Sequence, residues 1–172
     1  MFPVSDDNPH FLTPYVTYGL IGINVLSWLL LQGLGFDPLL PRSVCTFGLV
    51  PAEFTGAVPA GSAFAVGPTT SCVVTGEAVW LRLVTYMFLH GSWFHILFNL
   101  WFLWIFGNNV EDSMGHFRFA AFYLLCGVLA ALAQIAAIGE SLSPIVGASG
   151  AIGGVMGAYV LLYPRVNVHL LI

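Results

Sequence analysis

The chain has 172 residues, of which 58% are hydrophobic and only 7% are charged, whereas soluble domains carry about 25% charged residues. Four arginines, no lysine and eight acids cannot coat a soluble fold of this size, and 15% aromatic residues exclude a disordered chain. A net charge of -4 leaves no basic surface for phosphates. We therefore expect an all-α, multi-pass membrane protein without a nucleic-acid partner.

Four stretches free of Asp, Glu and Arg predict membrane-spanning helices, at about 13–34, 83–106, 119–138 and 149–163. The first has no basic segment before it, so we interpret it as a retained helix rather than a signal peptide. The fourth is short and rich in glycine. Residues 167–172 resemble the opening of another apolar helix, so we expect further spans to follow.

A long segment, 35–80, separates the first two predicted spans and contains five prolines. A connection of that length is usually functional or partly structured, and we expect short helical pieces at the membrane surface. We treat 1–172 as one domain with this loop inside it. Cys45 and Cys72 both lie in the loop, which suggests a disulfide. Three free thiols, Cys126 included, are the alternative that the sequence favours.

Polar side chains inside predicted spans are costly and therefore mark candidate functional residues: His90, His95, Asn99, Gln134 and Ser149. The four-residue spacing of His95 and Asn99 places both on one helix face, with two hydrogen-bond donors directed to a common point. On spacing alone we favour the simpler interpretation, in which they bond neighbouring helices for about 1 kcal/mol each.

The fourth predicted span opens with the sequence GASG at 147–150, and glycine recurs at 153, 154 and 157 along what we expect to be one helix face. A glycine stripe allows another backbone to approach closely. Ser149 would lie beside free amides at a helix N-terminus, where a developing oxyanion is stabilised. The alternative is a capping serine on a close-packed helix, and the short motif alone favours that alternative.

Together these motifs are more specific than either alone. The segment 90–99 (HGSWFHILFN), followed by 147–152 (GASGAI), resembles the rhomboid intramembrane serine proteases. Trp80 and Arg82 resemble the family's Trp-Arg pair, with Leu81 inserted between them. A four-residue ridge resembles that of the family's third helix and the acid before it: Glu111, Gly115, Phe119, Tyr123 and Gly127. The resemblance covers about 15–168.

The resemblance implies a six-helix bundle, of which about four spanning helices are present here. It also implies an endopeptidase that cleaves transmembrane segments of membrane proteins, without a cofactor or a metal. Ser149 would be the nucleophile, activated by a histidine on the sixth helix. Asn99, His95 and the Ser149 amide would form the oxyanion hole.

The same resemblance assigns supporting roles and an orientation. His90 and Arg82 would hold the first loop, and Gly147 and Gly150 would support the serine. The N-terminus would be cytoplasmic and the loop external, in a bacterial inner membrane. The arginines do not decide this orientation, because each side would carry two of them.

Two departures from the family's pattern bear on activity. His169 follows Ser149 by only twenty residues and is not accepted as the base, so we place that histidine beyond Ile172 and expect the 172-residue chain to be nearly inactive. Gly153 stands where many members carry an aromatic residue.

Three alternatives belong to other classes of protein. The first is a catalytically inactive rhomboid-like protein that binds transmembrane helices, although the presence of Ser149 argues against it. A metal site of His90, His95 and His116 lacks a supporting carboxylate geometry. A small transporter is disfavoured because the hydropathy shows no inverted repeat.

Overall fold

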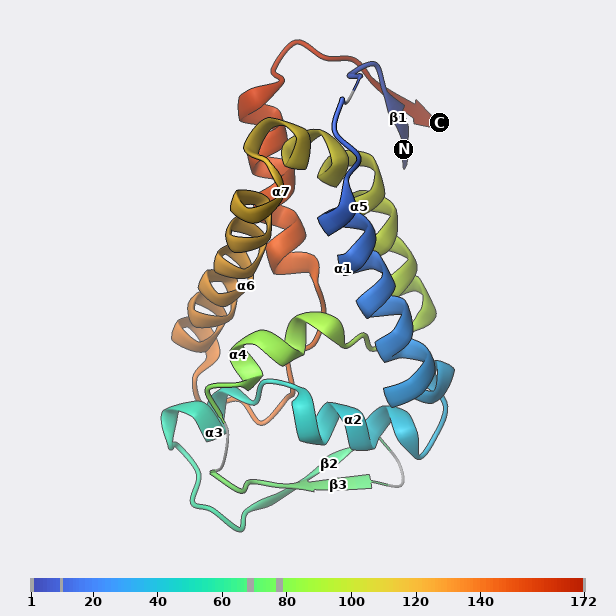
Figure 1. Cartoon of the computed structure of the whole chain (residues 1–172). Coiled ribbons are helices and arrows are strands. Elements are labelled where there is room, and N and C mark those ends of the chain that lie inside the picture. The colour runs from blue at the N-terminus through green and yellow to red at the C-terminus, as the bar shows by residue number, and fades with distance from the viewer. Residues whose placement is uncertain (1, 10, 68–69, 77–78, 172) are drawn as a thin grey trace.

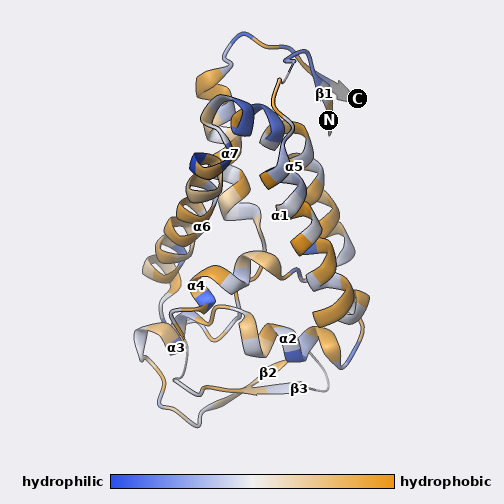
Figure 2. Ribbon diagram, in the orientation of Figure 1, coloured by the Kyte–Doolittle hydropathy of each residue, from blue (hydrophilic) through white to orange (hydrophobic). Residues whose placement is uncertain are grey.

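The computed structural model describes residues 2–9, 11–67, 70–76 and 79–171, and it consists of a helical bundle on a smaller layer built from the first loop (Figure 1). The layer lies at the lower end of the bundle in Figure 1, and hydrophobic residues dominate the bundle helices (Figure 2). The bundle contains α1 (Tyr15–Leu26) with its continuation η1 (Ser27–Leu31), α5 (Trp93–Met114), α6 (His116–Ile138) and α7 (Ser149–Leu162).

Each predicted apolar stretch contains an apolar helix. Helix length alone, however, does not establish how many of these helices cross a membrane. Within the described residues, α6 is the one unbroken helix that is long and apolar enough to span a bilayer. The two shorter apolar helices are α7 and the combined 15–31 segment. The predicted bounds of α6 and α7 agree with the structure to within three residues at each end.

The predicted span 83–106 is wrong as one continuous helix. The structure has α4 (Arg82–Thr85), η3 (Tyr86–Phe88) and then α5, with a bend of 95° between the two parts. Ser92 explains the new start, because its Oγ accepts a hydrogen bond from the backbone N–H of His95 (3.2 Å) and so caps α5. The helix also continues past Phe106 to Met114. Gly107 lies inside it at a close approach of α1, since a Cβ there would lie 3.1 Å from Thr17 Cγ2.

The prediction that residues 167–172 begin another apolar helix is also wrong. Residues Val168–Leu171 form strand β4, which pairs antiparallel with β1 (Phe2–Asp6). Pro164 follows the end of α7, and valines at 166 and 168 favour extended backbone.

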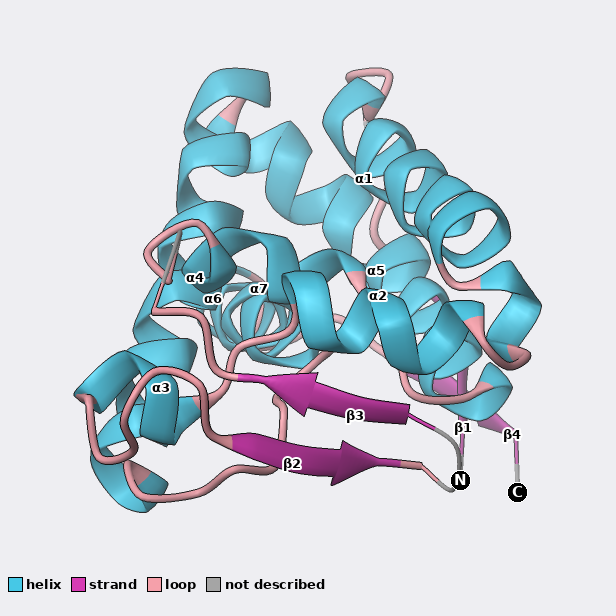
Figure 3. Cartoon of the chain, turned by 90° about the horizontal axis from the view of Figure 1, so that it is seen from below, coloured by secondary structure: helices cyan, strands magenta, loops and turns pink. Residues whose placement is uncertain are grey.

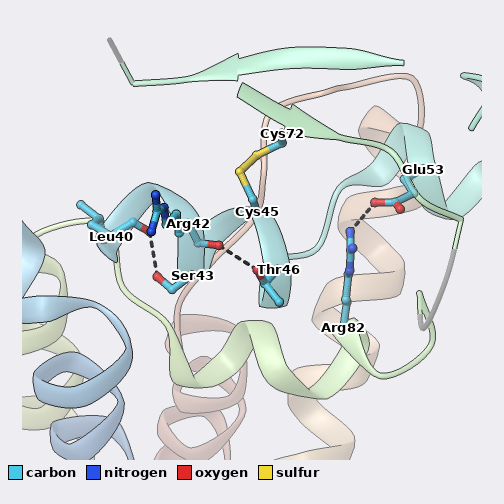
Figure 4. Close-up of a disulfide and its surroundings, with 8 residues drawn as sticks. All are labelled: Leu40, Arg42, Ser43, Cys45, Thr46, Glu53, Cys72 and Arg82. Atoms are coloured by element: carbon cyan, nitrogen blue, oxygen red, sulfur yellow. Dashed lines mark hydrogen bonds and ion pairs between the residues drawn. A yellow bond between two sulfur atoms is a disulfide. The ribbon is translucent and has the colours of Figure 1, made fainter. Parts of the chain in front are cut away.

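Segment 35–80 contains the short helices that the sequence predicted and a hairpin that it did not. The helices are α2 (Leu39–Phe47) and α3 (Pro51–Thr55), and the hairpin pairs β2 (Ala63–Val66) with β3 (Thr70–Val73) (Figure 3). A Cys45–Cys72 disulfide joins α2 to β3 (Figure 4), so the favoured alternative of three free thiols is wrong. Cys126 is free.

Small residues bring α6 and α7 into close contact. A Cβ on Gly150 would lie 2.5 Å from Ala130 Cβ, and one on Gly154 would lie 2.4 Å from Cys126 Sγ. By contrast, Gly153 and Gly157 face open space. The four glycines lie within an arc of about 100° on α7, which agrees with the expected glycine face, but only Gly150 and Gly154 lie against α6.

The predicted ridge is buried along α6 and continues into the end of α5. Phe119 and Tyr123 are fully buried in the apolar core between the helices. Glu111 lies near the end of α5 and accepts hydrogen bonds from the backbone N–H groups of Val16 (2.9 Å) and Thr17 (2.8 Å). Because these amides belong to the first turn of α1, the carboxylate satisfies donors that the helix itself cannot.

Candidate active site

His95, Asn99 and Ser149 line one cavity of about 330 Å³ between α5 and α7. Two chain segments about fifty residues apart in sequence therefore meet at this cavity. The other lining residues are apolar: Phe98, Phe102, Ile152, Gly153 and Met156. A small polar group surrounded by apolar walls can hold a polar reactant away from bulk water.

The start of α5 positions the two polar side chains of the first segment. Asn99 is buried, and its Nδ2 donates to the backbone oxygen of His95 (3.0 Å). An amide nitrogen carries two hydrogens, so a second donor stays available. The backbone N–H of Gly91 donates to His95 Nδ1 (3.4 Å), which leaves Nε2 to carry the proton of a neutral imidazole.

Gly147 has a conformation and a contact that only glycine satisfies. Its φ is +124°, and a Cβ there would lie 2.5 Å from His95 Nε2. The same Cβ would lie 3.7 Å from Ser149 Oγ, so the imidazole and the hydroxyl both flank this glycine. Any side chain at 147 would displace the His95 ring from the position beside Ser149.

Ser149 is the first residue of α7, and its surroundings fix where that helix begins. Gly147 donates its backbone N–H to the oxygen of Tyr86 (2.9 Å). Ile145 and Leu49 exchange two backbone hydrogen bonds, of 2.7 and 3.1 Å. The segment that leads into Ser149 is therefore attached both to the chain before the α5 break and to the layer built from segment 35–80.

His90 lies in the break before α5, not in the helix as predicted. It is fully buried, and its ring centre is 5.1 Å from that of His95. Its backbone N–H donates to Gln32 Oε1 (2.8 Å), and Gln32 Nε2 donates to the His90 oxygen (2.6 Å). Gln32 was not among the predicted candidates. It is a polar side chain in the first apolar stretch, which is the feature that made Gln134 a candidate.

Arg82 forms a buried ion pair with Glu53 of α3 (Figure 4). Glu53 Oε1 also accepts hydrogen bonds from the backbone N–H groups of Thr75 (3.1 Å) and Gly76 (3.0 Å). Trp80 packs on Phe54 of the same helix, with ring centres 4.9 Å apart. Glu53 was not predicted as a functional residue. The feature that could have indicated it is that it is a single acid in a nearly uncharged stretch.

Other candidate residues lie away from the cavity. His116 bonds Glu111 at the far end of α5 (2.6 Å), so the three histidines of the metal alternative do not meet. His169 bonds Asp7 (2.6 Å) beyond the opposite end of α7 from Ser149, and this hydrogen bond holds the pKa of Asp7 below its usual value. Gln134 lies on α6 and does not line this cavity.

The structure is a helical bundle with a cavity that a serine, a histidine and an asparagine line together. The family model described as the Rhomboid domain matches residues 77–172, which is more than half of the chain. The chain belongs to the rhomboid family.

Three relatives illustrate the similarity. Rhomboid protease GluP of Bacillus subtilis is 41% identical over 93 residues, covering 54% of this chain and 17% of the relative. Putative rhomboid protease YdcA of the same organism is 35% identical over 91 residues, covering 52% and 44%. Rhomboid-like protein 11, chloroplastic, of Arabidopsis thaliana is 40% identical over 83 residues, covering 48% and 29%. The matched stretch therefore spans less than half the length of each of these relatives.

Proposed function

We propose that the protein is an intramembrane serine endopeptidase that cleaves transmembrane segments of membrane proteins. The observation that carries the proposal is the cavity shared by Ser149, His95 and Asn99. Relatives that are named rhomboid proteases support the same activity. We place the protein in a bacterial inner membrane with the first loop outside, and the Cys45–Cys72 disulfide fits an oxidising external compartment.

In the proposed reaction, Ser149 Oγ attacks the peptide carbonyl carbon and forms a tetrahedral intermediate. Three donors would stabilise its oxyanion: Asn99 Nδ2, His95 Nε2 and the Ser149 backbone amide. Collapse of the intermediate breaks the peptide C–N bond, and water then hydrolyses the acyl-enzyme. A substrate helix must unwind locally before its carbonyl can reach Ser149, because helical carbonyls are already hydrogen bonded.

A general base has to take the Ser149 proton and pass it to the leaving amine. We assign this role to a histidine on a later helix that packs on the open face of α7. Gly153 and Gly157 support this assignment, because both face empty space and Gly153 also lines the cavity. Such a helix could therefore approach closely beside Ser149.

The test measures cleavage of a single-span model substrate by the full-length protein in liposomes. Ser149→Ala should lower turnover by about 10⁴-fold or more, and Asn99→Ala by about 10²- to 10³-fold. Ser113→Ala is the matched control, because this exposed serine lies at the far end of α5. The 172-residue chain alone should not cleave.

Turnover that survives Ser149→Ala would contradict the proposal. Turnover by the 172-residue chain would instead contradict the assignment of the base to a later helix. Binding of the substrate helix without any cleavage by the full-length protein would favour an inactive rhomboid-like binding protein.

A further inference from the structure

Strand β2 is the outer strand of the β2–β3 hairpin, in the layer built from segment 35–80. Its partner β3 lies against α2, to which the Cys45–Cys72 disulfide ties it (Figures 3 and 4). Among the described residues, β2 pairs with β3 alone. One edge of β2 therefore has no strand beside it.

The register shows which backbone groups point to that edge. Val74 donates its N–H to the oxygen of Ser62 (2.8 Å), and Phe64 is paired with Cys72 two residues further on. Hydrogen-bonded positions alternate along an antiparallel pair, so the N–H and C=O groups of Ala63 and Ala65 point away from β3. Both alanines are exposed and have small side chains that leave the edge accessible.

This edge lacks the charged residues that usually prevent strand addition. No charged residue occurs from 54 to 76. Native proteins commonly protect a free edge with lysine or with inward-pointing charges. An edge without them, fixed in place by a disulfide, is suited to pair with an extended segment.

A cleft of about 430 Å³ lies beside β2. Residues 64–67 line one side, and 142–144 line the other. Ser149 lies five residues after Pro144. The residues between them include Ile145 and Gly147, which form backbone hydrogen bonds with Leu49 and Tyr86, respectively. A segment lying in the cleft would thus run along the same stretch of chain that leads to the nucleophile.

We propose that the β2 edge binds an extended, uncharged external segment of the substrate by strand addition, next to the helix that is to be cut. The inference rests on the proposed function and names an additional binding site for the same substrate. Main-chain hydrogen bonds to Ala63 and Ala65 supply affinity, and the lining of the cleft, which contains no charged side chain, offers no partner to a charged residue. Residues 142–144 close the far side of the cleft, which favours one added strand over the two-stranded sheet of a second copy.

The test compares two model substrates with the full-length protein in liposomes. Both have the same transmembrane helix; one carries a twelve-residue external flank of alternating Thr and Val, and the other a Gly-Ser flank of equal length. Ala65→Pro removes an outward N–H and should raise KM for the Thr-Val substrate about tenfold without changing kcat. Ala65→Lys, which tests the edge without proline, should do the same, and neither variant should affect the Gly-Ser substrate.

Ala60→Lys is the matched control, because Ala60 is exposed just before β2 and gains the same charge away from the strand. It should leave both KM values unchanged. Equal KM values for the two substrates with the wild-type protein, or equal effects of both lysine variants, would overturn the proposal.

A binding measurement separates this proposal from the proposed function. Hydrogen exchange of the Ala63 and Ala65 amides is followed in full-length Ser149→Ala protein, with and without the free Thr-Val peptide. The peptide should protect both amides, even if the wild-type protein cleaves neither substrate. Absence of protection would overturn the proposal. Protection without peptide that rises with protein concentration would indicate a second copy at the edge, and protection by lipid alone a membrane contact; either result would also overturn it.

Discussion

The layer built from segment 35–80 and the helical bundle are held together by different interactions. A disulfide joins α2 to β3 within the layer, and a buried ion pair between Glu53 and Arg82 joins α3 of the layer to α4. In the bundle, glycines on α7 lie directly against α6. The difference follows from the surroundings: a thin layer buries little apolar surface and needs specific links, whereas helices in lipid associate through close packing of small residues.

The candidate active site lies where these two regions meet. His95 and Asn99 belong to a bundle helix, whereas the segment before Ser149 forms hydrogen bonds with Leu49 of the layer. Loosening the layer should therefore disturb the site through the 145–147 segment, and loosening the bundle should disturb it through α7.

The largest expected effect is loss of the buried ion pair. Glu53→Gln leaves the Arg82 charge buried without its partner, which should lower the free energy of unfolding by about 3–5 kcal/mol. The measurement is denaturation by SDS in mixed micelles. The double variant Glu53→Leu with Arg82→Met is the control and should recover much of the loss. Equal destabilisation by the single and double variants would show that the charge pair is not what holds the layer.

Reduction of the Cys45–Cys72 disulfide should have the next largest effect. The bond closes a loop between residues 27 positions apart, and its loss should cost about 2–4 kcal/mol. Hydrogen exchange should rise in the β2–β3 hairpin and leave α6 and α7 unchanged. Cys126→Ser is the control, because Cys126 is a free thiol on α6. Faster exchange throughout the bundle would contradict the separation of the two regions.

Overpacking the bundle should have the smallest effect of the three. Gly154→Val places a side chain where a Cβ already lies 2.4 Å from Cys126 Sγ, and should cost about 1–3 kcal/mol in the same SDS assay. Gly157→Val adds the same side chain one turn further from Ser149, where nothing lies within 4 Å. It should leave the stability of the 172-residue chain nearly unchanged. Similar losses for both variants would show that α7 does not pack through Gly154.

The sequence predicted the parts of the fold that depend on long apolar runs with clear ends. Both α6 and α7 are of this kind, since Gly139 follows the first and Pro164 the second. The bend before α5 escaped prediction because the stretch 83–106 was recognised by its lack of Asp, Glu and Arg, a criterion that does not distinguish one helix from two; the signal was His90, Gly91 and Ser92 at the break. The β2–β3 hairpin escaped because its strands have only four residues each.

The candidate site likewise has features that the sequence predicted and features that only the fold reveals. Spacing and family motifs identified His95, Asn99 and Ser149, because a motif is visible along the chain. The role of Glu53 required the tertiary fold, since its partner Arg82 lies 29 residues away and neither spacing nor charge links them. The packing of Gly147 against His95 likewise becomes visible only when α5 and α7 are brought together.

The central claim is that Ser149 is the nucleophile, and covalent labelling tests it most directly. Full-length protein in liposomes is treated with a fluorophosphonate, which modifies activated serines, and the adduct is located by peptide mass spectrometry. We expect one adduct, on Ser149, which forms more slowly in Asn99→Ala because that variant lacks one oxyanion donor. Loss of cleavage after treatment while Ser149 stays unmodified, or an adduct on a different serine, would contradict the claim.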